Sequence, residues 1–448
     1  MKKLFIPIAS LLISNALFLT GHGLILTILP LRAQLDAFTD TQIALTGSSY
    51  FAGFVLGCLV TPYIVRRVGH IRSYAVLASM ISALILLFHS FPIFSVWLLL
   101  RFLLGTCVSG LHMTIESWLN DRATRETRGT ILSVYTMINL GMITLGQQLI
   151  NFADPSGGQL FAIASILLSL AIVPVSLTIT LAPAPMQAVK LNLPKLWRLS
   201  HVGMGGAMCS GLVTGAFWAL GPIYARGVGL DAAGLSLFMS AVVVGGAIFQ
   251  LPLGRLSDHF DRRLVLFFSA LAGAGVSLLL AFFGGGMLSL PLALLWGGSV
   301  MTLYAICLAH ASDSATPDDF VMVGSGILFV LGICSAIGAP LASLIMSLVG
   351  PGGLFVYSAV CLLLFAVGIS LRRKTHVLPV VDATEPFIPI AETTPIAFEM
   401  DPRTQEPPID GDATVNAAAA VEPGDSAEAS NHSATDQDAD PNGENKPG

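Results

Sequence analysis

Long apolar stretches recur along this chain, and they constrain its fold more than any other feature. A helix needs about 20 apolar residues to cross the ~30 Å hydrocarbon core of a bilayer. Of the 448 residues, 54% are hydrophobic and 11% are charged, and the mean hydropathy is +0.78, which excludes an ordinary soluble globular domain. We predict an all-α integral membrane protein with twelve transmembrane helices, whose cores lie at 4–30, 43–65, 73–91, 94–117, 129–151, 159–182, 203–225, 234–254, 264–283, 288–310, 321–348 and 353–371.

The first stretch resembles a secretory signal peptide, because two lysines precede an apolar run in MKKLFIPIASLLISNALFL. No small-residue cleavage site follows it, and the next stretches continue the same pattern. We therefore predict that it is the first membrane span rather than a cleaved signal.

Lys and Arg fall almost entirely on one side of the predicted helices. Only Arg32 and Arg226 fall on the other side. Cytoplasmic loops of membrane proteins carry an excess of these residues, so the pattern predicts that both termini are cytoplasmic. The cytoplasmic set is Lys2, Lys3, Arg66, Arg67, Arg72, Arg122, Arg125, Arg128, Lys190, Lys195, Arg198, Arg255, Arg262, Arg263, Arg372, Arg373 and Lys374.

The chain divides into two similar halves. We predict a six-helix bundle over 1–182, a basic cytoplasmic linker over 183–202, and a second six-helix bundle over 203–375. Residues 53–70 align with residues 245–262 at an offset of 192 positions. Such pseudo-symmetric halves are typical of secondary transporters. The alternative is that two apolar helices rich in small residues are alike by composition alone.

The last part of the chain, residues 376–448, follows different rules. It is rich in Pro, Ala, Asp and Glu, and 15 acidic residues follow Lys374. A segment with few large apolar residues cannot offset the entropy of ordering. We predict a disordered acidic cytoplasmic tail that is solvated and dispensable, with contact to the basic loops as the alternative.

The stretch GGAIFQLPLGRLSDHFDRR, residues 245–263, combines an apolar helix with a polar, basic loop. A glycine lets two helix ends approach closely, and a carboxylate there can pair with an arginine or a helix N-terminus. We predict a cytoplasmic gate motif, against the alternative of an ordinary charged surface loop. Its members are Gly254, Asp258, Arg262 and Arg263 in the second half and Arg66, Arg67 and Gly69 in the first.

Charged residues inside a bilayer are costly, and each is a candidate functional residue. Arg101 lies about eight residues, or roughly 12 Å, into the fourth predicted helix, and no carboxylate lies at matching depth in any predicted helix. It is a candidate for a cavity residue that meets an anionic substrate. The alternative is a structural arginine bonded to a carbonyl or a polar side chain.

Two pairs of titratable residues are candidates for proton coupling. His112 and Glu116 lie one helical turn apart, and His310 and Asp313 lie three residues apart near the end of the tenth helix. The pKa of either residue type can be tuned toward neutral pH. For Glu116, pairing with the arginines at 122, 125 or 128 is an equal alternative.

Four further residues are candidate cavity residues: Trp218, Tyr224, Gln250 and Tyr304. Tyr224 is alternatively an interface anchor, and Gln250 alternatively bonds a neighbouring helix. All six cysteines fall inside apolar runs, so we predict no disulfide framework and no metal site. No phosphate-binding loop or catalytic motif occurs in the sequence. We therefore predict no cofactor and no enzyme activity.

The gate motif and the run RFLLG at residues 101–105 resemble those of the major facilitator superfamily, and the resemblance covers residues 1–375. The runs ESWLNDRATRETRG, GGAIFQLPLGRLSD and YAICLAHASD resemble a bacterial branch of largely uncharacterised inner-membrane permeases. The resemblance implies a monomeric secondary transporter of a small organic solute, coupled to protons or another ion, with no nucleic-acid partner. The first-half loop lacks the Gly and Asp of the family motif.

The resemblance also implies a mechanism in which the two halves rock about a central site. We expect Asp258 to latch the cytoplasmic side by engaging the N-terminal end of the fifth helix, near Arg128 and Gly129. A non-transporting membrane sensor that signals through the acidic tail is the alternative, and a membrane-embedded enzyme is a third class.

Overall fold

The computed structural model describes residues 8–123, 127–177, 191–313, 315, 319–373 and 394–396. Within these residues every regular element is helical. The elements are α2 (Ala9–Leu35), α3 (Asp40–Val68), α4 (His70–Ser90), α5 (Phe94–Arg122), α6 (Arg128–Gln148), the 3-10 helix η2 (Leu149–Phe152), α7 (Gln159–Ser176), α8 (Leu193–Leu199), α9 (His201–Gly227), α10 (Ala232–His259), α11 (Arg262–Phe283), α12 (Ser289–Val300), α13 (Leu303–Ser312), α14 (Phe320–Val349) and α15 (Gly353–Arg373).

The prediction of twelve membrane spans is confirmed, because twelve helical segments in the described residues are long and apolar enough to cross a bilayer. The tenth span consists of α12 and α13, which a turn at Met301 and Thr302 separates. The short helix α8 lies within the predicted linker and was not expected. The Asn192 side chain caps it by accepting the backbone N–H of Lys195 at 3.1 Å, as residues at this position commonly do.

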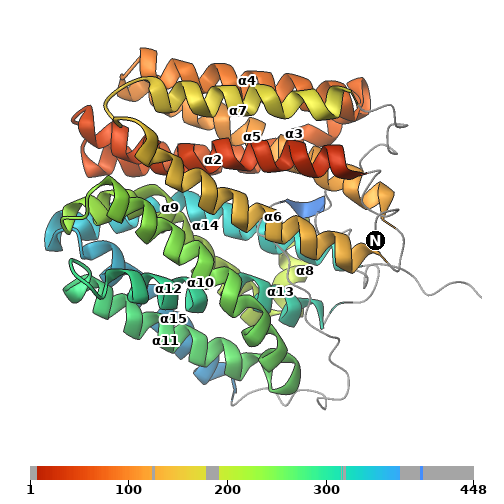
Figure 1. The fold of residues 1–448 in the computed structure, drawn as a ribbon. Coiled ribbons are helices and arrows are strands. Elements are labelled where there is room, and N and C mark those ends of the chain that lie inside the picture. Colours follow the sequence, from red (N-terminus) through yellow and green to blue (C-terminus); the bar gives the residue numbers. More distant parts are fainter. Residues whose placement is uncertain are drawn as a thin grey trace, which may run out of the picture. The chain divides into compact units, whose positions relative to one another are not determined.

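The two bundles consist of α2–α7 and α9–α15, drawn in red to yellow and in green to blue in Figure 1. In the first bundle α3 packs along α5, and α2 packs against α6 and α7. In the second, α9 packs along α14 and α10 along α12. The junction is formed by α2, α3 and α6 on one side and α9, α10 and α14 on the other. A site between the halves is therefore framed by these six helices.

The internal repeat continues beyond residues 53–70, and four of the six helix pairs begin at the same offset. Helices α2, α3, α4 and α6 begin 192 positions before α9, α10, α11 and α14 respectively. The closest backbone contacts repeat at the same offset. A Cβ atom at Gly53 would lie 1.9 Å from the Phe102 carbonyl oxygen, and one at Gly245 would lie 2.0 Å from the Leu294 carbonyl oxygen. Glycine is required at both places because only a bare backbone allows the two helices to approach this closely.

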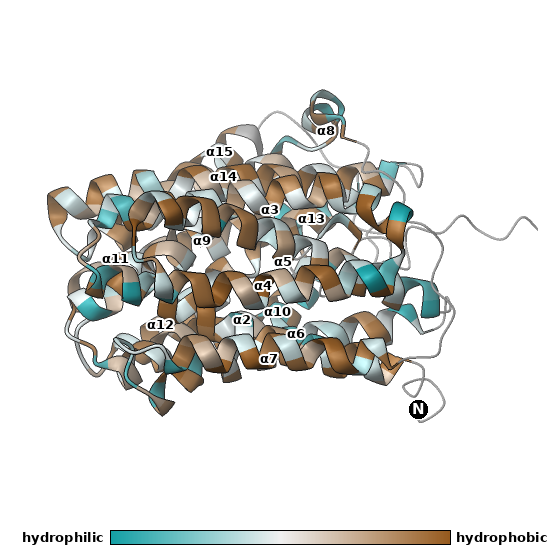
Figure 2. Cartoon of the chain, turned by 90° about the horizontal axis from the view of Figure 1, so that it is seen from above, coloured by the Kyte–Doolittle hydropathy of each residue, from teal (hydrophilic) through white to brown (hydrophobic). Residues whose placement is uncertain are grey.

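Hydrophobic residues cover the outer faces of the helices, and hydrophilic residues gather toward the helix ends (Figure 2). Large side chains such as Phe282, Leu344 and Leu364 are exposed on these faces. Exposed apolar surface of this extent is stable only in contact with lipid or a partner. Together with the twelve spans, it identifies a multi-pass membrane protein.

The two ends of the helical bundle differ in charge. Seven arginines lie near the ends of α3, α5 and α10 and at the starts of α6 and α11: Arg66, Arg67, Arg122, Arg128, Arg255, Arg262 and Arg263. We call this the basic end and the opposite one the far end. The far end includes the end of α2 and the start of α3.

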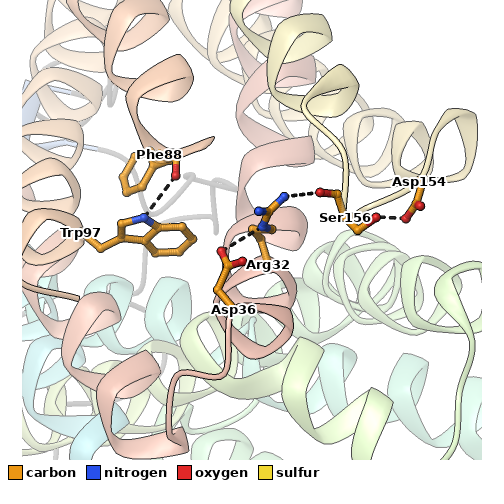
Figure 3. A network of polar contacts seen from close by, with 6 residues as sticks. All are labelled: Arg32, Asp36, Phe88, Trp97, Asp154 and Ser156. Carbon is orange, nitrogen blue, oxygen red and sulfur yellow. Dashed lines mark hydrogen bonds and ion pairs between the residues drawn. The ribbon is translucent and has the colours of Figure 1, made fainter. Parts of the chain in front are cut away.

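At the far end Arg32 ties the end of α2 to the loop between η2 and α7 (Figure 3). Its guanidinium contacts the Asp36 carboxylate at 2.9 Å and donates to the Ser156 carbonyl oxygen. The Ser156 backbone N–H in turn donates to Asp154 at 2.9 Å, which holds the pKa of Asp154 below its usual range. The one far-side arginine of the first half is therefore held in a structural network.

Candidate functional site

A cavity of about 240 Å³ lies between the two halves. This volume suits a small organic molecule rather than a macromolecule. The polar side chains that line it come mainly from the first half, and the second half contributes a largely apolar wall. The first half provides His22, Tyr50, Arg101, His112, Thr136 and Asn139, and the second provides Thr214, Trp218, Val243, Gln250, Met301 and Phe329.

Arg101 lies in the cavity wall, where its residue is only 4% exposed. Its guanidinium carbon is 5.9 Å from the centre of the Tyr50 ring. In the described part of the chain, no ion pair involves Arg101 and its Nε has no hydrogen-bond partner. A buried charge without a compensating partner is costly. This arrangement favours a cavity that receives a complementary anionic group.

Three other polar atoms of the cavity wall also lack a hydrogen-bond partner among the described residues: Asn139 Nδ2, Thr136 Oγ1 and Ser325 Oγ. Asn139 is positioned by its other amide atom, because its Oδ1 accepts a hydrogen bond from Asn15 Nδ2 at 2.8 Å. An unsatisfied buried donor costs about 1–3 kcal/mol. A ligand that offers hydrogen-bond acceptors would satisfy these groups.

Histidines continue the polar lining of the first half. The His22 Nε2 atom lies 3.4 Å from Tyr50 Oη. The Phe18 ring packs against both His22 and His112, with ring centres 5.8 and 5.1 Å apart. His22 is therefore both packed against aromatic rings and part of the cavity wall.

A hydrogen-bonded chain leads from the cavity to Glu116, which is buried. His112 Nδ1 lies 3.2 Å from Tyr135 Oη, and Tyr135 donates to Glu116 Oε1 at 2.8 Å. The two residues singled out in the sequence are thus connected through a third one. Tyr135 was missed because it comes from another helix, α6, and its position in the sequence shows no relation to His112.

The second candidate pair lies at the basic end of the second half. His310 is buried in α13, whereas Asp313 is exposed and forms an ion pair with Arg262 Nε at 2.8 Å. Arg262 also contacts Asp258 Oδ1 at 3.3 Å. Asp313 therefore belongs with the gate motif. At the offset of 192, Glu116 corresponds to Leu308, so the two candidate pairs are not equivalent positions of the repeat.

The remaining gate residues also lie at the basic end. Gly254 is buried in α10, and Asp261 caps α11 by accepting the Arg263 backbone N–H at 2.9 Å. In the first half, Arg67 is exposed and Arg66 lies over the Tyr63 ring at 4.7 Å. Gly69 joins α3 to α4 with a φ of 83°, a conformation that favours glycine.

Of the four candidate cavity residues, Trp218 and Gln250 line the cavity, whereas Tyr224 and Tyr304 are not among the lining residues. Tyr224 points into the second bundle, where its hydroxyl donates to the Leu280 carbonyl oxygen at 2.6 Å and its ring packs against Phe355. Tyr304 is completely buried in α13. Both rings belong to faces of their helices that the bundle core covers.

The halves are bonded to each other at the far end. Gln148 Nε2 in α6 donates to Ser240 Oγ at 2.6 Å and to the Ser236 carbonyl oxygen at 3.1 Å in α10. Asn151 Nδ2 donates to Ser236 Oγ at 3.1 Å, and Ser343 donates to Thr41 at 3.2 Å. The cavity is therefore closed on this side by direct contacts between the bundles.

At the basic end, residues from outside the twelve spans take part in the cavity wall. Leu191 of the linker and Pro395 of the predicted tail line it. The described segment Thr394–Ile396 is buried. The prediction of a disordered, solvated tail therefore does not hold for these three residues, and the rest of the tail lies outside the described residues.

Metal binding finds no support in the described residues, where no group of three or more His, Cys, Asp or Glu side chains is placed to hold an ion. The six cysteines are free thiols.

Comparisons with known proteins agree on one family. A model of the Major Facilitator Superfamily matches residues 203–403, and a model of sugar (and other) transporters matches residues 16–183. The uncharacterised MFS-type transporter YcaD of Escherichia fergusonii is 27% identical over 375 residues, which cover 82% of this chain and 96% of that protein.

Two solved structures show the same fold. The nucleoside transporter NupG has a TM-score of 0.72 at 12% identity and covers 82% of this chain and 99% of its own. The human organic anion transporter MFSD10 has a TM-score of 0.58 at 15% identity, with 81% and 98% covered. Identities this low speak for the arrangement of helices and not for a substrate.

Proposed function

Because this chain belongs to the major facilitator superfamily of membrane transporters, we propose that it is a secondary active transporter of a small organic anion. The solute crosses the bacterial inner membrane by alternating access, coupled to protons, through a single chain. The basic end, with both termini, faces the cytoplasm, since Lys and Arg accumulate on that side.

The observation that carries the substrate class is Arg101, buried in the cavity wall without an ion pair in the described residues. Guanidinium groups match carboxylates and phosphates in geometry and charge. The free donor of Asn139 and the hydroxyl of Thr136 supply further contacts to acceptor oxygens. A carboxylate that enters the cavity would compensate all three groups.

The part of the cavity wall that the second half provides would select the apolar body of the solute. Trp218, Met301 and Phe329 line the cavity there and present apolar and aromatic surface. We infer an amphiphilic solute, with its anionic group against the first half and its apolar body against the second. One neighbour of the fold is named an organic anion transporter, so the fold accommodates this substrate class.

Proton coupling would use the chain His112, Tyr135 and Glu116, because it connects the cavity to a buried carboxyl group. Protonation of Glu116 in the inward-open state would neutralise its charge. Opening and closing at the basic end would use Asp258, which pairs with Arg262 here and would engage the N-terminal end of α6 near Arg128 when this end closes.

A thermal-shift screen of the purified protein tests the substrate class. Pools of organic acids are each matched by the corresponding neutral amides. A ligand at a hundredfold excess over Kd stabilises the folded state by about 2.7 kcal/mol. We expect acids to stabilise the protein more than their amides do, and Arg101→Met to abolish the difference.

Arg226→Met is the matched control, because Arg226 is an exposed arginine on the second half. It should leave the stabilisation by acids intact. Stabilisation by acids that survives in Arg101→Met, or equal stabilisation by acids and amides, would refute the assignment of Arg101 to an anionic substrate.

A further inference from the structure

Three residues of the tail lie inside the protein. Thr394 is completely buried and Ile396 is 4% exposed, although they lie in the segment 376–448 whose composition predicts a solvated tail. They are separated in sequence from the end of α15 at Arg373, so the helical bundle itself does not force them into this position. Their burial therefore reports specific contacts with the bundle.

The contacts join the segment to the first half at the basic end. Ile396 packs with Cys58 and Val65 of α3 and with Met113 of α5. Pro395 is part of the cavity wall, and the Thr394 hydroxyl donates to Glu116 Oε2. The segment thus offers a branched apolar side chain to an apolar pocket and a hydroxyl to a buried carboxylate.

We propose that this region is a peptide-binding site, occupied by Thr394–Ile396 of the same chain, and that its occupation blocks the cavity. The site takes a short segment that consists of a hydroxyl residue, a proline and a branched aliphatic residue. Proline suits such a ligand, because its fixed φ leaves less freedom to lose on binding. The tail is then a tethered inhibitor of transport rather than a solvated appendage.

Two consequences follow for the transporter. The far end is closed by the bonds of Gln148, so a solute would enter or leave through the basic end, where Pro395 forms part of the cavity wall and would stand in its way under this proposal. The segment also occupies Glu116, the carboxyl group to which proton coupling is assigned above. The blocking effect rests on the proposed transport function, whereas occupation of the site does not.

Cys58 is a native reporter of this occupation, because its thiol is buried in the cluster that contains Ile396. The experiment measures the rate at which N-ethylmaleimide modifies Cys58 in the full-length protein, with a Cys58→Ser variant to identify the signal. Burying an aliphatic side chain of this size favours the bound state by tenfold or more. We expect Ile396→Asp to raise the labelling rate by about tenfold or more.

Ile409→Asp is the matched control, since it makes the same change in the tail outside the buried segment. It should label as slowly as the wild type. A synthetic peptide with the sequence of residues 391–400 should slow the labelling of Ile396→Asp again. It must be added at about millimolar concentration, the range of effective concentration that a short tether provides.

Equal labelling rates in the wild type and Ile396→Asp, with complete labelling in detergent-denatured protein, would overturn the proposal. A second variant guards against misfolding of Ile396→Asp. In Ile396→Cys, mild oxidation should form a disulfide between Cys58 and the cysteine at position 396, because the side chain it replaces packs with Cys58, and in Ile409→Cys it should not. Absence of the 58–396 link would also overturn the proposal. Neither readout needs transport, so a failed transport assay leaves both interpretable.

Discussion

Gln148 provides the sharpest test of how the two halves are held together. Its amide makes three hydrogen bonds with α10. Nε2 donates to Ser240 Oγ and to the Ser236 carbonyl oxygen, and Oε1 accepts a hydrogen bond from Ser236 Oγ at 3.3 Å. Gln148→Met keeps nearly the same volume and removes all three. Ser240 retains its bond to Gln147 Oε1 at 3.1 Å and Ser236 its bond to the Ala233 carbonyl oxygen at 2.9 Å, so the substitution leaves neither hydroxyl without a partner.

The expected magnitude follows from these bonds. Hydrogen bonds between membrane helices contribute about 0.6 kcal/mol each, so their loss weakens closure by about 2 kcal/mol, or about 30-fold. A protein whose far end is closed in a ratio of 99 to 1 would change to a ratio of about 3 to 1. Nitroxide labels at Leu35→Cys and Leu348→Cys, both at exposed far-end positions, would report the change as a longer distance in pulsed electron resonance.

Gln42→Met is the matched control. Gln42 is an amide at the same end, but its side chain accepts the Thr39 backbone N–H within the first half. It should leave the distance distribution unchanged. Ser240→Ala combined with Gln148→Met should shift the distances by less than the sum of the two single variants. An unchanged distribution in Gln148→Met, or an equal shift in Gln42→Met, would refute the assignment of the clamp to these bonds.

Three further predictions concern packing, coupling and the gate. Gly53→Ala and Gly245→Ala should each lower the apparent melting temperature, because overpacking costs about 1–3 kcal/mol. Gly141→Ala and Gly275→Ala are the controls, since their new Cβ would meet no atom within 4 Å, and they should be neutral or slightly stabilising. Equal effects at all four sites would contradict the close helix approach at Gly53 and Gly245. Tyr135→Phe removes the hydrogen-bonded link between His112 and Glu116. Uptake driven by a pH gradient, measured with the acid that the thermal-shift screen identifies, should fall by about tenfold or more, while stabilisation by that acid is retained. Uptake at the wild-type rate would exclude proton transfer through Tyr135. Asp258→Asn, made together with Ile396→Asp so that the tail does not cover Cys58, should shift the protein toward the state that is open at the basic end. This shift should appear as faster maleimide labelling of Cys58 than in Ile396→Asp alone, and an unchanged rate would argue against the latch.

The positions of the spans were predictable because hydropathy is a local property that a helix carries in its own sequence. The repeat was also visible, since Gly53 and Gly245 each need a bare backbone for the same helix contact. The sequence did not predict that Tyr224 lies on a face of α9 that points away from the cavity, because packing against neighbouring helices sets the rotation of α9. Arg101 could be found, since a charge within an apolar run stands out in the sequence.

The tail shows a different limit of sequence reasoning. Composition averaged over 376–448 predicts solvation, yet burial of Thr394–Ile396 depends on three residues and on a complementary pocket. Averages over a long segment cannot detect so short a ligand. Tyr135 was missed for a related reason, because its partners His112 and Glu116 lie on another helix, and only the folded structure brings the Tyr135 hydroxyl from α6 to these two residues of α5.

The offset of 192 also explains how the chemistry is divided between the halves. Backbone contacts are repeated, but the polar residues of the cavity are not. The first-half residues His22, Arg101, His112, Glu116 and Asn139 correspond to Thr214, Ala293, Tyr304, Leu308 and Leu331. If the halves rock as rigid bodies, the buried charges stay with one body, and their interactions within it do not change. The balance between the two states then depends on short-range contacts across the junction, such as those of Gln148. Removing the three hydrogen bonds of Gln148, which together contribute about 2 kcal/mol, should therefore shift the equilibrium more than removing an exposed charge pair at either end, because such a pair contributes only about 0–1 kcal/mol.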